Sequence, residues 1–446
     1  MTATIWIFAL GQMGWAMLAG IISNWLVYFY QPSAESIEAG QILFIQQGNV
    51  ILKVITIIGL ITFVGRIFDA FTDPYIANLS DKSKNPKGKR IPFMRKVAIP
   101  FSIVTTLVFF APKNTISSIN VIWLLVMLLG FYLCMTIYCT PYNALIPVIG
   151  HDQKSRIAVS TAISLTFIVG TSLAYVAPVI WNMLTPAFSR VTAMRITFGS
   201  LSIIACILML IPTFFIDERK LKQVESNNEN AFTSLKTTFN NKDFRTFVYS
   251  DVLYFTALTI FQTGLPFFVV SLMNLQESHS ATLFVLMTAL SLLWYPLVNI
   301  LAPKFGKKKM VMAAFVIFAI DYTLTALSGI IGFGGFAWGV LIVAIASISM
   351  AILGILPQAM VADVAQEDEI NTKQNRNGMF FAARTFAFKL GQSLAMLIFT
   401  GFAANGTSGY RLAAATAAVL CILACFALTR YDEKRIMATC LAQQEV

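Results

Sequence analysis

Long apolar runs alternate with short polar segments along nearly the whole chain. A helix that crosses the hydrocarbon core of a bilayer needs about 20 apolar residues, and runs of that length recur throughout this sequence. They are continuous, unlike the alternating strands of roughly ten residues in a membrane β-barrel. The first run ends in Trp25, Tyr28 and Tyr30, which we expect to form an aromatic belt at the membrane interface. We expect twelve membrane-spanning helices, near residues 5–30, 48–79, 97–112, 120–147, 157–185, 196–216, 246–273, 281–303, 310–330, 337–362, 379–403 and 412–429.

The longest polar stretch, residues 217–244, separates six of these predicted helices from the other six. The sequence therefore predicts an N-terminal six-helix bundle at 1–216, a cytoplasmic central loop, and a C-terminal six-helix bundle with a short cytoplasmic tail at 245–446. A basic, glycine-containing turn at 78–90 has a counterpart at 301–309, at the same place in its half. Such internal repeats are typical of secondary transporters that bind their solute near the bilayer midplane.

The composition supports an all-α polytopic membrane protein: 57% of the residues are apolar and only 12% are charged, about half the usual charged share of a soluble domain. The net charge of +11 follows membrane topology rather than nucleic-acid binding. With the N-terminus inside, 24 of the 32 Lys and Arg residues fall in inner segments and four in outer segments, as the positive-inside rule requires. We therefore expect both termini in the cytoplasm, a location in the cell (inner) membrane, contacts with anionic lipid, no nucleic-acid partner and a functional monomer.

Ionisable side chains within the predicted spans are the strongest functional candidates, because a charge in the membrane costs at least a few kcal/mol. The sequence assigns no role to two of them, Asp251 and Asp321. Arg384 lies near the inner end of its span, where it could either reach the interface or contact an anionic solute. The full set is Lys53, Arg66, Asp69, Asp73, Asp251, Asp321, Arg384 and Lys389.

The second predicted span carries Arg66, Asp69 and Asp73, whose spacing places all three on one face of a helix. Two carboxylates four residues apart repel each other when both are ionised. A bound Na⁺ or Li⁺, a shared proton, or a nearby basic side chain would relieve that repulsion. Pro74 follows directly and frees a backbone carbonyl near Ala70. The segment predicts a cation site, with a structural charge network at a helix end as the alternative.

Lys389 and Asp69 have the same predicted depth within the membrane. Lys389 and Asp69 each lie about ten residues from the inner ends of their predicted spans, roughly 15 Å deep. Thr136 lies at a similar depth. Because a lysine at that depth must be paired or deprotonated, we hypothesise that Lys389 shares one cavity with Asp69 and Asp73. The cation would then replace or weaken a Lys–Asp contact during transport.

Motifs of enzymes and nucleotide-driven pumps do not occur in a suitable context in the sequence. We therefore expect a transporter rather than an enzyme. It would need no cofactor and would be driven by an ion gradient, with Na⁺ or H⁺ as the coupling cation and Li⁺ as a further candidate.

Two segments are specific enough to indicate a family: GRIFDAFTDP at 65–74 and RTFAFKLG at 384–391. With them, nearly the whole chain resembles the glycoside–pentoside–hexuronide:cation symporters of the major facilitator superfamily. The resemblance implies two pseudo-symmetric six-helix bundles and alternating access of one solute site to the two sides of the membrane. It also implies a cation site at Asp69 and Asp73, assisted by Thr136.

The same resemblance implies roles for other charged residues. Arg66 would lie beside the aspartate pair, and Lys389 would be an essential lysine. Asp363 and Glu369 would form inner-side charge contacts that close a cytoplasmic gate. If the cation is Na⁺, further neutral oxygens would be needed, from Thr72, Thr136 or a backbone carbonyl.

The sugar-binding positions of the family are not kept. This chain has Trp15 and Ala16, Cys139 and Gly354 where sugar carriers of the family have charged residues or tryptophan. Losing such partners destroys recognition of the original ligand, so we expect symport of a different sugar or sugar acid. An alternative is a sodium-dependent transporter of a lysophospholipid or other amphiphile with the same fold, and a remote alternative is a transporter-like sensor. Candidate solute contacts are Gln12, Trp15, Asn143, Gln262, Gln358 and Arg384.

Overall fold

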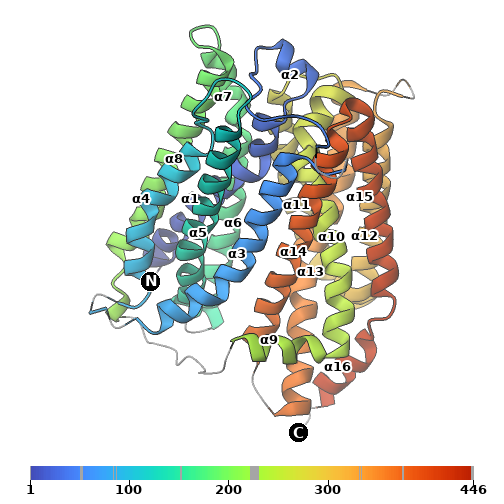
Figure 1. Cartoon of the computed structure of the whole chain (residues 1–446). Helices are drawn as coiled ribbons and strands as arrows, with labels where there is room; N and C mark the ends of the chain where they lie inside the picture. The colour runs from blue at the N-terminus through green and yellow to red at the C-terminus, as the bar shows by residue number, and fades with distance from the viewer. Residues whose placement is uncertain are drawn as a thin grey trace. The chain divides into compact units, whose positions relative to one another are not determined.

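The chain forms two compact, helical units (Figure 1). The computed structural model describes residues 2–50, 54–83, 85–86, 88–150, 153–220, 231–330, 332, 334–373 and 376–442. Unit 1 comprises Met1–Asn227 together with Gln276–Ala281, and unit 2 comprises Asn228–Leu275 together with Thr282–Val446.

The helices of unit 1 run from α1 to α8 and end in a short 3-10 turn, with the bounds α1 (Thr2–Tyr30), α2 (Ala34–Glu38), α3 (Ile57–Asp81), α4 (Ile91–Leu107), α5 (Ser118–Ile149), α6 (Gln153–Tyr175), α7 (Ala177–Leu184), α8 (Arg190–Phe215) and η1 (Glu218–Lys220). The helix α1 packs against α6 and α8. Both α3 and α4 pack against α5, which places the charged face of α3 beside α5.

The end of α1 lies in an aromatic core. Trp25, Tyr28 and Tyr30 are at most 1% exposed. The indole of Trp25 donates Nε1–H to Ala174 O at 2.7 Å and packs edge-on against Trp181 of α7. The predicted aromatic belt is therefore wrong here, because helix packing gives these rings and their polar atoms protein partners instead of lipid headgroups.

The segment Gln276–Ala281 belongs to unit 1, although the residues before and after it in the sequence belong to unit 2. Its Glu277 forms a buried ion pair with Arg190 and accepts a hydrogen bond from Trp181 Nε1 at 2.9 Å. Together these contacts tie the segment to α7 and α8.

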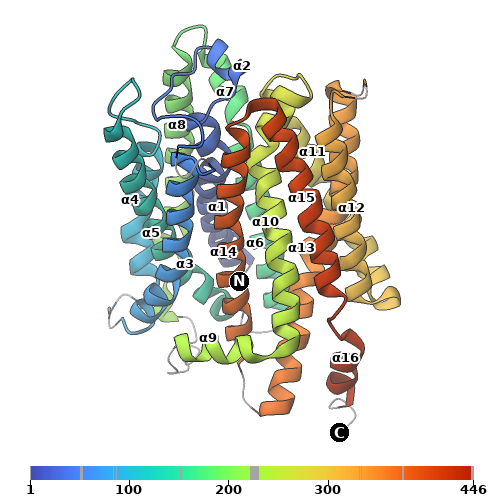
Figure 2. The same ribbon diagram turned by 45° about the vertical axis from the view of Figure 1, so that its right-hand side comes forward.

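The helices of unit 2 have the bounds α9 (Ala231–Asn240), α10 (Lys242–Phe267), the π-helical turn η2 (Phe268–Leu272), α11 (Ser278–Phe305), α12 (Lys307–Leu327), α13 (Gly335–Thr372), α14 (Asn377–Ala403), α15 (Gly406–Leu428) and α16 (Glu433–Ala442). The helix α15 packs against both α10 and α12, and α10 also packs against α14 (Figure 2). The short α9 lies across the end of α10 (Figure 2).

Ten helical segments of the described chain are long and apolar enough to cross a membrane. The second and third predicted spans, which correspond to α3 and α4, are not among them. Ionisable residues lie along α3, and α4 has only 17 residues. The count of twelve membrane-spanning helices therefore stays a prediction.

Two predicted boundaries are wrong. The helix α3 begins at Ile57 instead of residue 48, because Thr56 caps it by accepting a hydrogen bond from Gly59 N at 3.0 Å. The helix α4 covers Ile91–Leu107 instead of residues 97–112. Lys53, which we expected inside the second span, lies outside the described residues.

An acidic cap repeats in both units. In unit 1 the Glu218 carboxylate accepts hydrogen bonds from Arg90 N (2.9 Å) and Ile91 N (3.0 Å) at the start of α4. In unit 2 the Glu433 carboxylate accepts from Lys307 N (2.6 Å) and Lys308 N (3.1 Å) at the start of α12. A carboxylate is well placed at a helix N-terminus, where backbone N–H groups lack helical partners.

A glycine makes room for each of these caps. Gly88 and Gly306 adopt φ of 118° and 86°, and a Cβ on Gly306 would come within 2.9 Å of Glu433 Oε2. Both glycines lie in the basic turns whose similarity suggested a repeat. The sequence also carries a signal that we missed: an Asp-Glu pair, Asp217-Glu218 or Asp432-Glu433, begins within four residues of the end of the last long helix of each half.

Candidate functional site

Two aspartates of α3 and one threonine of α5 form the polar centre of unit 1. Asp69 and Asp73 stand four residues apart on α3, and Thr136 faces them from α5. Thr136 Oγ1 lies 3.1 Å from Asp69 Oδ1 and 3.1 Å from Asp73 Oδ1. Asp69 is fully buried and Thr136 is 1% exposed. The structure therefore brings together the three residues that the sequence and its family resemblance placed at the cation site.

The hydrogen-bonding capacity of this cluster favours a positive ligand. A threonine hydroxyl has one hydrogen to donate, yet Thr136 Oγ1 lies within hydrogen-bonding distance of two carboxylates. Thr72 Oγ1 lies 3.2 Å from Thr136 Oγ1 and donates to the Asp69 backbone oxygen at 3.1 Å. Within these four side chains, acceptor atoms outnumber the hydrogens available, and a proton or a bound cation would complete the arrangement.

The oxygens of the cluster also suit a hard cation. Asp69, Asp73, Thr136 and Thr72 supply carboxylate and hydroxyl oxygens from adjacent turns of two helices. Pro74 lies inside α3 and lacks the N–H that a carbonyl one turn earlier would accept. The residues present fit Na⁺ or Li⁺, which bind oxygen, as well as H⁺, which needs only one carboxylate.

Arg66 lies two turns before Asp73 on α3 and contacts two neighbouring helices. Its Nη2 donates to Ser23 Oγ of α1 at 3.3 Å. Its guanidinium carbon lies 5.3 Å from the ring centre of Tyr132 of α5, a cation–π distance. Arg66 thus links α1, α3 and α5, and its direct effect on the aspartate pair stays a prediction.

Asp251 and Arg384 form a buried ion pair in unit 2. Arg384 Nε donates to Asp251 Oδ2 at 2.7 Å, and Arg384 Nη2 donates to Asp251 Oδ1 at 3.0 Å. Their side chains are 4% and 6% exposed. The pair resolves the open role of Asp251 and gives Arg384 a protein partner instead of the membrane interface. A role of Arg384 toward an anionic solute stays a prediction.

Lys389 lies on α14 and is 9% exposed, so its side chain is buried within the protein, and its depth in the membrane stays a prediction. It belongs to unit 2, whereas Asp69 and Asp73 belong to unit 1. The hypothesis of a cavity shared by Lys389 and the aspartate pair therefore stays a prediction.

The candidate solute contacts differ in their surroundings. Gln12 is buried and accepts a hydrogen bond from Trp15 Nε1 at 3.1 Å, so these two act as a pair on α1. Gln262 is partly buried, whereas Asn143 and Gln358 are exposed. Exposure leaves Asn143 and Gln358 accessible, and the packing of Gln12 limits how it can turn toward a solute.

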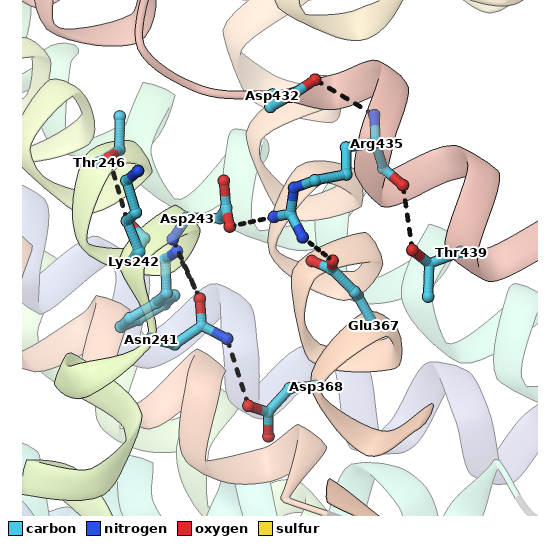
Figure 3. Close-up of polar contacts among 10 residues, drawn as sticks. Asn241, Lys242, Asp243, Thr246, Glu367, Asp368, Asp432, Arg435 and Thr439 are labelled. Carbon is cyan, nitrogen blue, oxygen red and sulfur yellow. Dashed lines mark hydrogen bonds and ion pairs between the residues drawn. The ribbon is translucent and has the colours of Figure 1, made fainter. Parts of the chain in front are cut away.

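An ionic network joins the start of α10, the last turns of α13 and the start of α16 (Figure 3). Arg435 of α16 donates to Glu367 of α13 at 2.7 Å and forms a second ion pair with Asp243 of α10. Asn241 Nδ2 donates to Asp368 Oδ1 at 3.2 Å. Burial alone would lower the pKa of Arg435, but the neighbouring carboxylates, Asp243 first, outweigh it and raise that pKa. The network fastens α16 to the rest of unit 2.

The predicted gate residues lie next to this network. Asp363 of α13 pairs with Lys307 of α12, with 2.5 Å between Asp363 Oδ2 and Lys307 Nζ. This ion pair lies within unit 2, where it links α12 to α13. Glu369 lies farther along α13 and is partly buried. A gating role for Asp363 and Glu369 stays a prediction.

With this geometry described, comparison with known proteins decides the family. The family model described as "MFS/sugar transport protein" matches residues 7–430. The chain belongs to this family. It is therefore a multi-pass membrane transporter and not an enzyme, as the absence of catalytic motifs predicted.

Relatives of the chain are symporters or carriers by name. An uncharacterized symporter of Synechocystis sp. is 22% identical over 88% of this chain and 83% of that protein. A glucuronide carrier protein homolog of Escherichia coli is 23% identical over 75% of this chain and 72% of that one. The sodium-dependent lysophosphatidylcholine symporter 1 of Gallus gallus is 22% identical over 78% of this chain and 72% of that one.

The fold is shared with solved transporters. The crystal structure of a mutant of the nucleoside transporter NupG matches 96% of this chain and 99% of that chain, with a TM-score of 0.68 and 13% sequence identity. At this identity the likeness shows the fold alone. Together with the family model it confirms the all-α major facilitator architecture that the sequence predicted.

Proposed function

We propose that this protein is a cation-coupled symporter that carries a sugar or sugar acid across the cell (inner) membrane by alternating access, with both termini in the cytoplasm. The observation that carries the proposal is the position of Thr136 Oγ1, 3.1 Å from both Asp69 Oδ1 and Asp73 Oδ1. Two ionised carboxylates at this site carry a charge of −2, and binding of one proton or one Na⁺ would lower it to −1.

Repulsion between the two carboxylates gives a reason why cation binding would be coupled to solute transport. Without a positive ligand, the two ionised carboxylates beside Thr136 repel each other. Binding of Na⁺ or H⁺ removes the repulsion and draws α3 and α5 together through shared oxygens. An ion that stabilises one arrangement of these helices shifts the population toward the conformation that binds solute.

A second cargo class has its own support. The lysophosphatidylcholine symporter match covers 78% of this chain, and the chain has apolar or small residues at Ala16, Cys139 and Gly354, where sugar carriers of the family are polar or aromatic. A lysophospholipid would be held by buried apolar area, whereas a sugar needs paired hydrogen bonds. The two cargo classes therefore predict opposite responses to competitors.

The decisive experiment is solute uptake and counterflow in proteoliposomes under separate Na⁺ and H⁺ gradients. The panel contains neutral sugars, uronic acids and short-chain lysophosphatidylcholine. We expect a sugar or sugar acid to exchange and one gradient to accelerate net uptake. Uptake of lysolipid alone would establish the second cargo class. Binding without counterflow of any panel member would support a sensor and contradict the symport proposal.

Substitutions in the cluster connect coupling to the site. Asp73→Asn is expected to abolish gradient-driven uptake, because it removes one of the two carboxylates that bind the ion. Asp243→Asn, in the exposed ion pair with Arg435, serves as a control and is expected to keep gradient-driven uptake. Unchanged coupling in both Asp69→Asn and Asp73→Asn would contradict this cation site.

A further inference from the structure

A second buried carboxyl group, Asp321, belongs to unit 2, whereas the aspartate pair belongs to unit 1. Asp321 lies on α12, is 0% exposed, and occupies the buried face of that helix. Neither Asp321 Oδ1 nor Asp321 Oδ2 has a hydrogen-bond partner among the residues that the structure describes. Buried polar atoms are paired in the great majority of cases, so this carboxyl requires an explanation.

The other interior aspartates of the described chain each receive at least one hydrogen bond. Asp251 receives two hydrogen bonds from Arg384, and Asp69 receives one from Thr136. For Asp321, by contrast, an ionised carboxylate would stand among helices without a counter-charge. Burying an ionised carboxylate costs far more free energy than burying the neutral acid, so such a group binds a proton instead of remaining charged.

The groups around Asp321 are neutral at physiological pH. Cys421 of α15 lies near enough to sense its charge, and Tyr322 follows it on α12, beside Tyr254 of α10. The Tyr322 hydroxyl also has no hydrogen-bond partner among the described residues. Thiols and phenols stay protonated near neutral pH, so they supply no positive charge.

Charged groups on the helices packed against α12 are engaged elsewhere. Arg411 of α15 donates to the Ala326 carbonyl oxygen at 2.6 Å. On α13, Asp363 pairs with Lys307 at the opposite end of α12, about 20 Å along the helix from Asp321. The part of α13 before Asp363, residues 335–362, contains no charged residue. A proton is therefore the positive charge that this site can hold.

A metal cation does not fit here. Hard cations take several oxygen ligands, and among the described residues no side-chain hydroxyl lies within hydrogen-bonding distance of the Asp321 carboxyl to share in binding one. A proton needs only one carboxyl oxygen. We propose that Asp321 is a proton-binding site of unit 2, separate from Asp69 and Asp73, and that it holds its proton in this conformation at neutral pH.

Infrared spectroscopy of the full-length protein in liposomes tests this proposal. We expect a carbonyl-stretching band of a protonated carboxylic acid at neutral pH, which shifts when all aspartates carry ¹³C at the carboxyl carbon. The band is measured in Asp69→Asn/Asp73→Asn, in which the aspartate pair cannot supply a protonated carboxyl, and it is lost when Asp321→Asn, which keeps the shape of the neutral acid, is added. It remains when the control Asp243→Asn is added instead, so the result does not depend on which cation drives transport.

A second variant covers the case in which Asp321→Asn does not fold. In the same background Asp321→Glu keeps a carboxylic acid but on a residue without the ¹³C label, so the isotope shift of the band is expected to disappear. Absence of the band from Asp69→Asn/Asp73→Asn, its persistence after a folded Asp321→Asn is added, or an isotope shift that survives in Asp321→Glu would overturn the proposal.

Discussion

Arg384 holds Asp251 through two hydrogen bonds, Nε to Oδ2 at 2.7 Å and Nη2 to Oδ1 at 3.0 Å. The residues lie 133 positions apart, on α14 and α10. A planar guanidinium that meets a carboxylate at two points is the strongest geometry for such a pair. Because both side chains are almost fully buried, each buried charge is stabilised by the opposite charge of its partner.

Removing one member of this pair is expected to destabilise unit 2 strongly. Asp251→Ala or Arg384→Ala leaves an uncompensated buried charge, at a cost of about 3–5 kcal/mol. The double variant Asp251→Ala/Arg384→Met removes both charges and is expected to recover most of that loss. Thermal unfolding in detergent measures all three. Additive losses in the double variant would contradict a coupled pair.

The hydroxyl of Thr136 is expected to set the cation affinity. Thr136→Ala removes a hydrogen bond to a charged group, worth about 1.5–3 kcal/mol, so the cation concentration at half-maximal uptake should rise about tenfold or more. Thr136→Ser keeps the hydroxyl and should stay close to wild type. Cation-dependent uptake in proteoliposomes measures the effect. Equal behaviour of the two variants would show that the hydroxyl does not contribute.

Loss of the acidic caps is expected to weaken α4 and α12. Glu433→Ala leaves two N–H groups at the start of α12 without their carboxylate, a loss of about 1–2 kcal/mol. Glu218→Ala should cost a similar amount at α4 because it caps in the same way. Thermal unfolding is again the measurement. Asp217→Ala is the control, since its exposed ion pair with Arg219 contributes at most about 1 kcal/mol.

Cys440 reports on the attachment of α16. Its thiol is buried, and its Sγ lies 3.8 Å from the Asp363 carbonyl oxygen. Burial first, and then Asp363 and Glu367, raise the pKa of this thiol. Because the thiolate is the reactive form, labelling by a maleimide should be slow at neutral pH and should accelerate as the pH rises toward the raised pKa.

Arg435→Ala is expected to speed that labelling. It removes the ion pairs to Asp243 and Glu367 and so frees α16 to expose Cys440. Arg435→Lys, which keeps the charge, should lie between wild type and Arg435→Ala. The additional label must disappear in Arg435→Ala/Cys440→Ser. Labelling of Arg435→Ala at the wild-type rate would mean that the network does not hold α16.

Features that depend on one helix alone were predictable from the sequence. Apolar length predicted where most helices lie, because about 20 apolar residues suffice to cross a bilayer whatever surrounds them. The spacing of Asp69 and Asp73 predicted a shared face, since residues four apart on a helix are neighbours. The absence of catalytic motifs predicted a transporter, and the family match agrees.

Only the tertiary structure decided which distant side chains meet. The partner of Asp251, the capping of Arg90 N by Glu218 across 128 residues and the lack of any described partner for Asp321 each depend on which helix faces pack together. That choice is made by the joint packing of all the helices, and no local periodicity encodes it. The sequence thus determined where the interior charges lie, whereas the fold determined which of them are neutralised by a neighbour and which must bind an ion.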